Sequence, residues 1–366
     1  MDSFTFHCPT KIYYRQGGLS LIGKILREDY SCKKALMVFG GHSLIDNGYY
    51  DTIVSSLREN GIDFETYSGI EANPDVSDAR KAILAARTFK PDFVLACGGG
   101  SVIDCAKLIC HGYYYSGNPL DFFKKGVRPL HSLPLGVVLT LSASGSEMSD
   151  SCVISDRETG FKGGFNDESN YPTFSLLDPS LTDTVSDYQT AIGLVDMFSH
   201  SFERYMSQNE RLEPCDGLAL SVMADIVATS KMLFGDKKDI KEGRRSMMLL
   251  GSLSHNGFTS FGKKKNFVVH HAEHRLSGRY PALAHGQGIA LLLPVFLEKN
   301  KDILKAKILR MAKQVFLSRV EDVDSSIAAL KDWLSFLPIY HSFEELPFIV
   351  AEEEIDQAEK RLELGM

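Results

Sequence analysis

The first half of the chain alternates short apolar runs with amphipathic segments. Six segments are predicted to be strands, and two segments between them have a helical period: strands at Lys34–Phe39, Asp63–Tyr67, Asp92–Cys97, Leu135–Leu141, Val153–Ser155 and Thr173–Leu177, and helices at Leu44–Asn60 and Val76–Thr88. Strands that alternate with helices in this way are typical of an α/β domain with a mainly parallel sheet.

After Asp178 and Pro179 the pattern becomes helical to the end of the chain. Seven further helices are expected: Cys215–Leu233, Lys241–His255, Val268–Ser277, Gln287–Lys299, Ile303–Leu317, Ser325–Leu334 and Glu352–Leu364. We therefore predict an α/β domain over residues 1–180 and an all-α domain over 181–366. There is no internal repeat, low-complexity tract or flexible linker.

Composition narrows the class of protein without naming a function. The chain has 366 residues, is 44% hydrophobic and 24% charged, and carries a net charge of −7. No stripe of Lys and Arg is interleaved with aromatic residues, so nucleic acid is not expected as a partner. The amino terminus has no signal-peptide pattern and no apolar run approaches a membrane span, so no membrane association is expected. Seven scattered cysteines without a CxxC spacing favour a reducing, cytoplasmic location.

One short stretch of the helical half is rich in histidine. Four of the chain's 11 histidines lie between Asn266 and Gln287, at positions 270, 271, 274 and 285. We expect Asn266 to cap a short helix that stops near Gly278, with His271 pointing about 100° away from its neighbours at 270 and 274. His285 then opens an apolar segment. A single buried histidine is usually a hydrogen-bonded core residue, but several that converge favour a metal site.

A second helical segment offers further ligands. Asp196 and His200 lie four residues apart within Ala191–Tyr205 and so share one face of a helix whose neighbouring residues are apolar. A carboxylate in such surroundings needs a cation or a hydrogen-bond donor. An Asp–His hydrogen bond along a core helix is the simpler interpretation, because this spacing is common. Together with the histidine cluster, the pair favours a site with one carboxylate and three imidazoles.

Two loops of the α/β half suit ligand binding. Gly98–Ser101 joins a predicted strand to a helix expected to begin at Val102, where backbone N–H groups approach a phosphate without obstruction. The loop matches neither the GxGxxG fingerprint nor the P-loop, and a plain tight turn explains it equally well. The small hydroxylated segment Ser142–Glu147 also follows a strand; its simpler interpretation is a solvated loop. Lys162 is expected in a glycine-flanked turn, where a lysine is usually only solvated.

Several segments, taken in order, resemble the iron-containing (group III) alcohol dehydrogenases, and most closely the butanol-dehydrogenase-like branch. They are FTFHCPTKIYY near the amino terminus, GGGSVIDCAK from Gly98, TLSASGSEMS from Thr140, Lys162 followed by LLDPSL, GLVDMFSHSFE, and HHAEHRLS with AHG. The resemblance covers nearly the whole chain. It implies the dehydroquinate synthase-like fold of that family, with an amino-terminal Rossmann-like nucleotide-binding domain and an all-helical metal-binding domain.

The resemblance also implies roles for individual residues. The metal ligands would be Asp196, His200, His270 and His285, holding Fe²⁺ or Zn²⁺, and His274 would lie near the nicotinamide and assist a proton relay. The cofactor would be lined by Asn73, Gly98, Gly99, Gly100, Ser101, Asp104, Thr140, Ser144, Ser149 and Lys162. The loop between His274 and His285 is one residue longer than the family pattern. His271 therefore stays open as a ligand in place of His270.

The end of the first strand bears on the choice of cofactor. Val38-Phe39 is followed by Gly40, Gly41, His42 and Ser43, with no carboxylate before Asp46. A carboxylate there would accept the ribose hydroxyls of NAD and repel a 2′-phosphate. Gly40, Gly41 and Ser43 offer room and donors instead, so we expect NADP(H) to be favoured over NAD(H). A Gly-Gly turn without cofactor contact is the alternative.

The implied function is a metal-dependent interconversion of alcohols with aldehydes or ketones by hydride transfer to or from NAD(P). Small-molecule substrates and a homodimer are expected. A glycerol-dehydrogenase-like or dehydroquinate-synthase-like enzyme is the alternative within the fold. A cofactor-binding scaffold without activity is the non-enzymatic alternative, although a scaffold has no need of four metal ligands.

Overall fold

The computed structural model of the protein describes residues 4–207, 213–263, 266–319 and 321–364. It separates into two compact units. The α/β unit consists of Cys8–Ser142 and Ser146–Thr184, and the helical unit of Met1–His7, Ala143–Gly145 and Val185–Met366. The expected limits of the functional domains, 1–180 and 181–366, stay predictions.

The α/β unit contains eight strands and six α-helices among its described residues. They are β1 (Lys11–Tyr14), α1 (Ile22–Lys24), β2 (Lys34–Phe39), α2 (Ser43–Asp46), α3 (Tyr49–Glu59), β3 (Asp63–Tyr67), α4 (Val76–Phe89), β4 (Phe93–Gly98), α5 (Gly100–Tyr114), α6 (Asp121–Lys124), β5 (Leu135–Leu139), β6 (Ser151–Asp156), β7 (Phe161–Asn166) and β8 (Phe174–Leu177). Short 3-10 or π turns occupy Gly18–Leu21, Ile25–Asp29, Ser146–Met148, Glu168–Asn170 and Pro179–Thr182.

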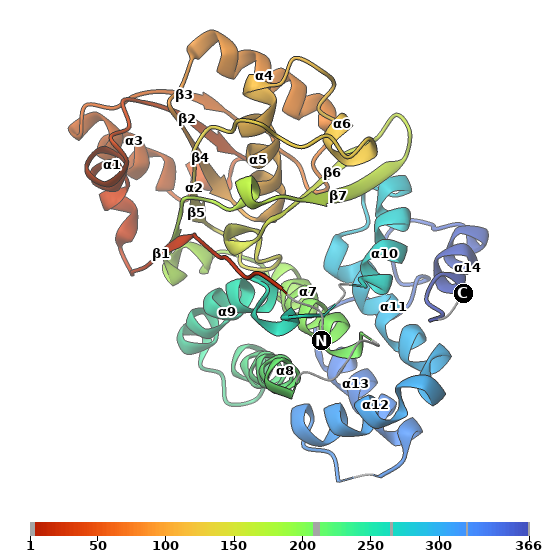
Figure 1. Cartoon of the computed structure of the whole chain (residues 1–366). Helices are drawn as coiled ribbons and strands as arrows, with labels where there is room; N and C mark the ends of the chain where they lie inside the picture. The colour runs from red at the N-terminus through yellow and green to blue at the C-terminus, as the bar shows by residue number, and fades with distance from the viewer. Residues whose placement is uncertain (1–3, 208–212, 264–265, 320, 365–366) are drawn as a thin grey trace. The chain divides into compact units, whose positions relative to one another are not determined.

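Six of these strands form one sheet in the order β1-β8-β5-β4-β2-β3, and every neighbouring pair is parallel. The prediction of an α/β fold with a mainly parallel sheet is therefore confirmed. The central strands are continuous apolar runs because both of their faces are covered by helices. Figure 1 shows α1 and α3 on one face of the sheet and α4 and α5 on the other.

The two faces of β2 show how this burial arises. Ala35, Met37 and Phe39 pack in one cluster with residues of α1 and α3. Leu36 and Val38 point the other way, because side chains alternate along a strand, and they are at most 1% exposed. The edge strand β3 has no such run and is mostly exposed. The buried sheet thus holds the carboxyl ends of β2, β4 and β5 side by side, and the loops that follow these strands begin at the same edge.

Two local predictions in this unit were wrong. The helix expected over Leu44–Asn60 is two helices, α2 and α3, because Gly48 between them has a φ of 72°, outside the helical region. Lys162 is not in a turn. It lies in β7, which pairs antiparallel with β6, and its partner across the ribbon is Ser155. The turn comes earlier, at residues 157–160, and Gly164 lies in the strand facing Val153.

The described residues of the helical unit form eight α-helices and one 3-10 turn at Phe258–Ser260. The α-helices are α7 (Asp187–Met206), α8 (Glu213–Phe234), α9 (Ile240–His255), α10 (Val268–Arg279), α11 (His285–Lys299), α12 (Lys301–Val315), α13 (Val323–Phe336) and α14 (Glu352–Lys360). The prediction of an all-helical second half is confirmed.

Helix α7 is the core of this unit. Every residue from Thr190 to Met206 is buried, and the helix packs against α8, α9 and α11. The helix begins at an N-cap, Ser186, whose side chain accepts a hydrogen bond from the N–H of Gln189. Because α7 is covered on all sides, any charged side chain it carries must be compensated inside the unit.

The amino terminus of α10 is not the one predicted. Asn266 was expected to be the N-cap, but the N-cap is Phe267, which makes no side-chain cap, and Gly278 lies inside the helix instead of ending it. The cap comes from another helix: the Glu203 carboxylate of α7 accepts hydrogen bonds from the N–H groups of Val269 (2.6 Å) and His270 (3.3 Å). A cap supplied across the fold leaves no local signal in the sequence.

Within the described residues, one helix has the length and hydropathy of a membrane span. This is α8, and 44% of the relevant window is buried. Its residues Leu220, Met223 and Ile226 belong to the hydrophobic core of the helical unit.

Candidate metal and cofactor sites

Three imidazole nitrogens surround one carboxylate oxygen in the helical unit. Oδ1 of Asp196 lies 3.7 Å from Nε2 of His270, 3.7 Å from Nε2 of His285 and 3.8 Å from Nδ1 of His200. These distances are too long for hydrogen bonds. Ligand atoms of Asp196, His270 and His285 all lie within 4.8 Å of one another. His200 adjoins this group, with its ring centroid 4.6 Å from that of His270.

These separations fit a metal ion. Bonds of about 2.0–2.2 Å to nitrogen and oxygen place tetrahedral ligand atoms roughly 3.3–3.6 Å apart. The separations around Asp196 are only slightly longer. One carboxylate with three imidazoles suits Fe²⁺ or Zn²⁺.

Different elements bring the four side chains together. Asp196 and His200 lie one turn apart on α7, as the spacing predicts. His270 lies in the first turn of α10, and His285 is the first residue of α11. The two helices that carry the later histidines pack against one another, and α11 packs on α7.

A buried carboxylate lies behind His270. The Glu203 side chain, 3% exposed, accepts a hydrogen bond from Nδ1 of His270 in addition to the two backbone bonds that cap α10. When Nδ1 donates its proton to Glu203, Nε2 keeps its lone pair, and it is Nε2 that faces Asp196. Glu203 thus fixes the tautomer and the direction of a candidate ligand.

His285 is held in the same way by Glu273. This glutamate lies on α10, is fully buried, and accepts a hydrogen bond from Nδ1 of His285. Neither glutamate is among the site residues predicted from the sequence. The position of Glu203 near the site could have been predicted, because Glu203 follows Asp196 by seven residues and therefore shares its helical face. For Glu273, the only indication in the sequence is that it follows His270 by three residues.

Several buried polar atoms of this cluster lack a hydrogen-bond partner among the described residues. They are Oδ1 of Asp196, Nδ1 of His200 and Nε2 of His270. Each such atom costs about 1–3 kcal/mol when it is left unsatisfied. All three belong to proposed metal ligands, and a bound cation is the partner that satisfies them together.

The pKa of His270 also indicates that the buried carboxylates around it favour a positive charge at this place. Burial by itself lowers the pKa of His270, but the charge of Glu203, its hydrogen bond to the ring and the nearby charge of Asp196 outweigh burial and raise the pKa to about 9. Burial, followed by the neighbouring rings of His255 and His270, holds the pKa of His200 well below its ordinary value. Without a metal ion, a proton on His270 therefore supplies part of the charge that the carboxylates require.

Two further histidines of α10 lie in different surroundings. His274 is partly buried, and its ring centroid lies 5.2 Å from that of His285 and 6.4 Å from that of His270. Among the described residues two groups of side chains could hold a metal ion: Asp196, His270 and His285, and Glu273, His274 and His285. His271 is exposed and belongs to neither group. The geometry thus brings His270, and not His271, to Asp196.

In the α/β unit, the predicted cofactor loops gather at the carboxyl edge of the sheet. Gly98 ends β4, Thr140 follows the neighbouring β5, and the N–H of Thr140 donates to the carbonyl of Gly98 over 3.2 Å. Helix α5 begins at Gly100, two residues earlier than expected, with Gly99 as its N-cap and no capping side chain. The amino end of α5 therefore presents backbone N–H groups at this edge, as a phosphate site requires.

Packing gives a second reason for two of these glycines. A Cβ on Gly98 would meet the side chain of Val102 at 2.6 Å, and one on Gly99 would meet Leu141 at 3.1 Å. Both residues are therefore needed for the tight strand-to-helix turn itself. Partly buried Gly100 and Ser101 follow in the first turn of the helix.

Gly40, Gly41 and Ser43 lie at the same edge, after β2. Gly40 approaches the carbonyl of Ile70 closely, whereas a Cβ on Gly41 would meet no atom within 4 Å. Gly41 and Ser43 are exposed. Ser144 belongs to the short stretch Ala143–Gly145, which groups with the helical unit.

The remaining predicted cofactor residues form two networks. Lys162 donates to Oδ1 of Asn73 over 2.8 Å, and Asn73 has a left-handed backbone with a φ of 53°. Asp104 accepts from the Ser146 hydroxyl (2.5 Å) and from the N–H of Val153 (3.0 Å). Burial raises the pKa of the Asp104 carboxyl above its ordinary value.

Ser149 and Lys107 hold the loop that follows β5. Ser149 is fully buried, and its hydroxyl accepts from the N–H of Ser151. The buried Lys107 ammonium donates to the carbonyls of Ser146, Ser149 and Ser151 and to the Ser146 hydroxyl. The family motif GGGSxxDxAK thus carries two residues, Asp104 and Lys107, that fix this segment. Ser149 would act on a cofactor only indirectly.

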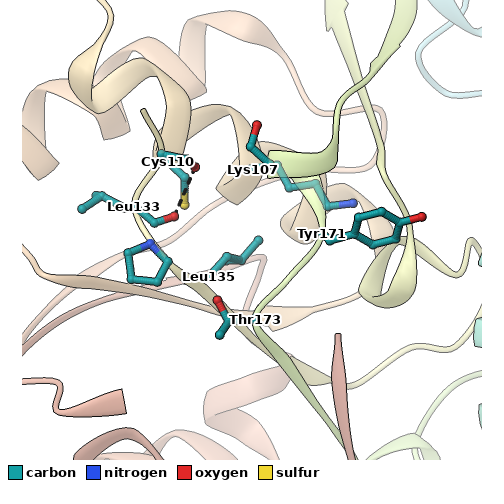
Figure 2. A pocket seen from close by; sticks show the side chains of 9 residues that line it. Lys107, Cys110, Leu133, Leu135, Tyr171 and Thr173 are labelled. Carbon is teal, nitrogen blue, oxygen red and sulfur yellow. Dashed lines mark hydrogen bonds between the residues drawn. The ribbon is translucent and has the colours of Figure 1, made fainter. Parts of the chain in front are cut away.

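A cavity of about 250 Å³ in the α/β unit is lined in part by Lys107, whose ammonium also holds the loop after β5. Its lining includes Cys110, Leu133, Leu135 and Thr173, and Figure 2 shows these side chains around it. Leu135 begins β5 and Thr173 directly precedes β8, so the cavity is at the amino end of the strands. Ligands of open α/β sheets bind at the carboxyl end. This cavity is therefore not the proposed cofactor site.

Comparison with known families agrees with this geometry. The profile of the iron-containing alcohol dehydrogenases matches residues 9–179, and the profile described as the C-terminal part of the Fe-containing alcohol dehydrogenase family matches residues 190–361. Together the two matches span most of the chain.

Individual relatives agree as well. The chain is 40% identical to NADH-dependent butanol dehydrogenase A of Clostridium acetobutylicum over 298 residues, 81% of this chain and 76% of that protein. It is 30% identical to the NADPH-dependent aldehyde reductase YqhD of Escherichia coli over 346 residues, 93% and 88% of the two chains. The crystal structure of NADH-dependent butanol dehydrogenase A from Thermotoga maritima superposes with a TM-score of 0.92 at 32% identity, covering 99% of this chain and 90% of the other. The chain belongs to the iron-containing alcohol dehydrogenase family, in its butanol-dehydrogenase-like branch.

Proposed function

We propose that this protein interconverts alcohols and aldehydes or ketones by hydride transfer to or from NAD(P), with a divalent metal ion in the helical unit. The observation that carries the proposal is the arrangement around Asp196, where three imidazole nitrogens lie 3.7–3.8 Å from one buried carboxylate oxygen. A structural core has no use for such a cluster, because each unsatisfied atom destabilises it.

The four proposed ligands, Asp196, His200, His270 and His285, would hold the ion. When bound, the ion polarises the oxygen of the alcohol or carbonyl substrate, and the nicotinamide accepts or supplies the hydride. The carboxylates behind His270 and His285 keep Nε2 of each ring directed inward. The family name supports Fe²⁺ as the ion, and Zn²⁺ accepts the same ligands.

His274 is the proposed proton carrier. It is partly exposed and lies beside His285, but it is not required to complete the set of four ligands. An imidazole in that place takes the alcohol proton during oxidation and returns it during reduction. A His274→Ala variant is accordingly expected to keep its metal and lose turnover.

The nicotinamide cofactor is proposed to bind at the carboxyl edge of the sheet, with its phosphates at the amino end of α5. The residues proposed to contact the cofactor there are Gly98–Ser101, Thr140 and the residues that follow β2, namely Gly40, Gly41 and Ser43. The Lys162–Asn73 pair, Asp104 and Ser149 support the adjoining segments. Ser144 stays a proposed contact on the strength of the family pattern.

NADP(H) is proposed to be used at least as well as NAD(H). Gly41 is open and exposed, Ser43 is exposed, and the chain has no carboxylate between Phe39 and Asp46. The relatives include proteins named for NADH and proteins named for NADPH. The test compares kcat/KM for NADPH and NADH with one aldehyde. A tenfold or larger preference for NADH, about 1.4 kcal/mol, would refute the proposal.

Domain limits, location and assembly are also proposals. Residues 1–180 and 181–366 are proposed as the functional domains, and a cytoplasmic homodimer as the working form. The absence of CxxC spacing among the seven cysteines supports the location. Sedimentation of the purified protein measures the assembly, and a monomer would exclude the homodimer.

The deciding experiment measures metal content and NAD(P)H oxidation on the same preparation. We expect one divalent ion per chain and oxidation of NADPH or NADH when a short aldehyde is added. Removal of the ion by a chelator should stop turnover, and its return should restore turnover. A metal-free preparation that still reduces aldehydes at the full rate would disprove the proposed role of the cluster.

A further inference from the structure

The three proposed histidine ligands are not held alike. His270 and His285 each place Nδ1 against a buried glutamate. Among the described residues, the carboxylate within ion-pair distance of His200 is Asp196, on the ligand side of the ring. His200 therefore needs another neighbour to set the direction of its imidazole.

That neighbour is His255, the last residue of α9. The ring centroids of His200 and His255 are 4.0 Å apart and the rings are inclined by 74°, an edge-to-face arrangement. The other adjacent rings of the cluster are farther apart, at 4.6–5.2 Å. Edge-to-face pairs are favourable because the positive edge of one ring meets the negative face of the other.

The backbone at His255 is itself held in place. The Arg204 guanidinium, one turn after His200 on α7, donates to the carbonyls of Ser254 and His255. Gly145 also packs so closely that a Cβ on it would meet the carbonyl oxygen of Gly251 at 2.4 Å and Cβ of His255 at 2.6 Å. The end of α9 thus presents the His255 ring from a fixed position.

We propose that His255 is a positioning residue that fixes the imidazole of His200 for metal ligation. The inference rests on the proposed metal site. His255 acts through its ring, and it belongs to neither group of potential ligand atoms found among the described residues. It takes the place that Glu203 and Glu273 have behind the other two histidines. Removing the ring leaves His200 free to turn away from the ion, whereas another flat ring preserves the contact.

The test compares the wild-type chain with His255→Leu, His255→Phe and the surface control His341→Leu. Apparent Co²⁺ affinity is measured by competition with a chelator, together with the visible spectrum of the bound ion and the thermal midpoint of the metal-free protein. We expect His255→Leu to bind Co²⁺ about 10-fold more weakly and to show an altered spectrum, in line with outer residues of metal sites. His255→Phe should stay within about threefold of the wild type, since it keeps the ring that the contact requires.

Every other result counts against the inference. If His255→Leu binds Co²⁺ within about threefold of the wild type, with the same spectrum, the ring has no positioning role. If His255→Phe loses the ion as completely as His200→Ala does, a nitrogen of His255 is required and the ring contact is not the cause. If His255→Leu does not fold, His255→Ala, which also removes the ring, is measured in its place and judged by the same affinity and spectrum. A wild-type chain that binds no Co²⁺ at all would instead overturn the proposed metal site.

Discussion

The Glu203→Gln variant tests the arrangement of the site more sharply than removal of a ligand does. The Glu203 carboxylate accepts three hydrogen bonds: from the N–H of Val269, from the N–H of His270 and from Nδ1 of His270. Gln has almost the same shape, but it has no charge and only one accepting oxygen. In either orientation of the amide, its NH₂ group faces at least one of the three donors.

The size of the effect follows from these contacts. A buried donor without an acceptor costs about 1–3 kcal/mol, so the free energy of unfolding of the metal-free protein should fall by roughly that amount. Metal affinity should fall further, because residues behind a ligand histidine typically contribute about 10–100-fold. That range is about 1.4–2.7 kcal/mol of binding free energy. The pKa of His270 should also fall, since Glu203 is the largest of the charges that raise it.

Chelator competition and denaturant unfolding measure the two quantities separately. Glu273→Gln is the matched variant, because Glu273 holds His285 with the same contact. Its effect should be smaller, since the His285 side chain is 25% exposed and that of His270 is 8% exposed. Glu352→Gln on the exposed face of α14 is the control. The reasoning is refuted if Glu203→Gln keeps metal affinity within about threefold and unfolds at the same denaturant concentration as the wild type.

Three further predictions concern the ligands. Asp196→Ala or His200→Ala should abolish bound metal and turnover while circular dichroism shows the fold intact; full metal occupancy in either variant would place the site elsewhere. His270→Gln should lose tight metal binding and His271→Gln should keep it, and the opposite pattern would assign the ligand to His271. Because the pKa of metal-free His270 is raised to about 9, its proton must leave when metal binds. Apparent affinity should therefore rise about tenfold per pH unit up to roughly pH 9, and a flat profile would contradict the assignment.

Much of the α/β half could be predicted, because its signals are local. The run Lys34–Phe39 is the strand β2, residue for residue, and Asp63–Tyr67 is β3. Continuous apolar runs alternating with helical periods are sufficient for that. The prediction of one helix over Leu44–Asn60 was wrong because Gly48 has a left-handed backbone, which periodicity alone does not reveal.

The candidate site was predictable in part for the same reason. Asp196 and His200 share a helical face by spacing, and the structure places them 3.8 Å apart. Their convergence with His270 and His285 comes from tertiary packing, which the sequence suggests only through family resemblance. The residues that orient these side chains are harder to predict from the sequence than the proposed ligands themselves. His255 gave no signal, since nothing in the end of α9 indicates which ring it will meet.

The N-cap of α10 was wrongly predicted at Asn266, and the role of Glu203 was not predicted at all. Both errors have the same physical cause. The first N–H groups of a helix can be satisfied from anywhere in the fold, and sequence rules consider only the neighbouring residues. Here the satisfying group is a carboxylate from α7, and it also binds the ring of His270. The same side chain therefore caps the start of α10 and orients a proposed metal ligand, His270, on it. The position of α10 and the direction of His270 are coupled through Glu203.

That coupling has an electrostatic consequence for the whole cluster. Asp196, Glu203 and Glu273 are at most 4% exposed, and their charges lie within one buried region of the helical unit. Each buried charge costs several kcal/mol unless it is compensated, and the neutral imidazoles beside them add no positive charge. Protonation of His270 offsets one negative charge, whereas a divalent ion offsets two and leaves every imidazole neutral. The buried glutamates thus do more than orient histidines. We therefore expect the helical unit to be more stable with the proposed cation bound than without it.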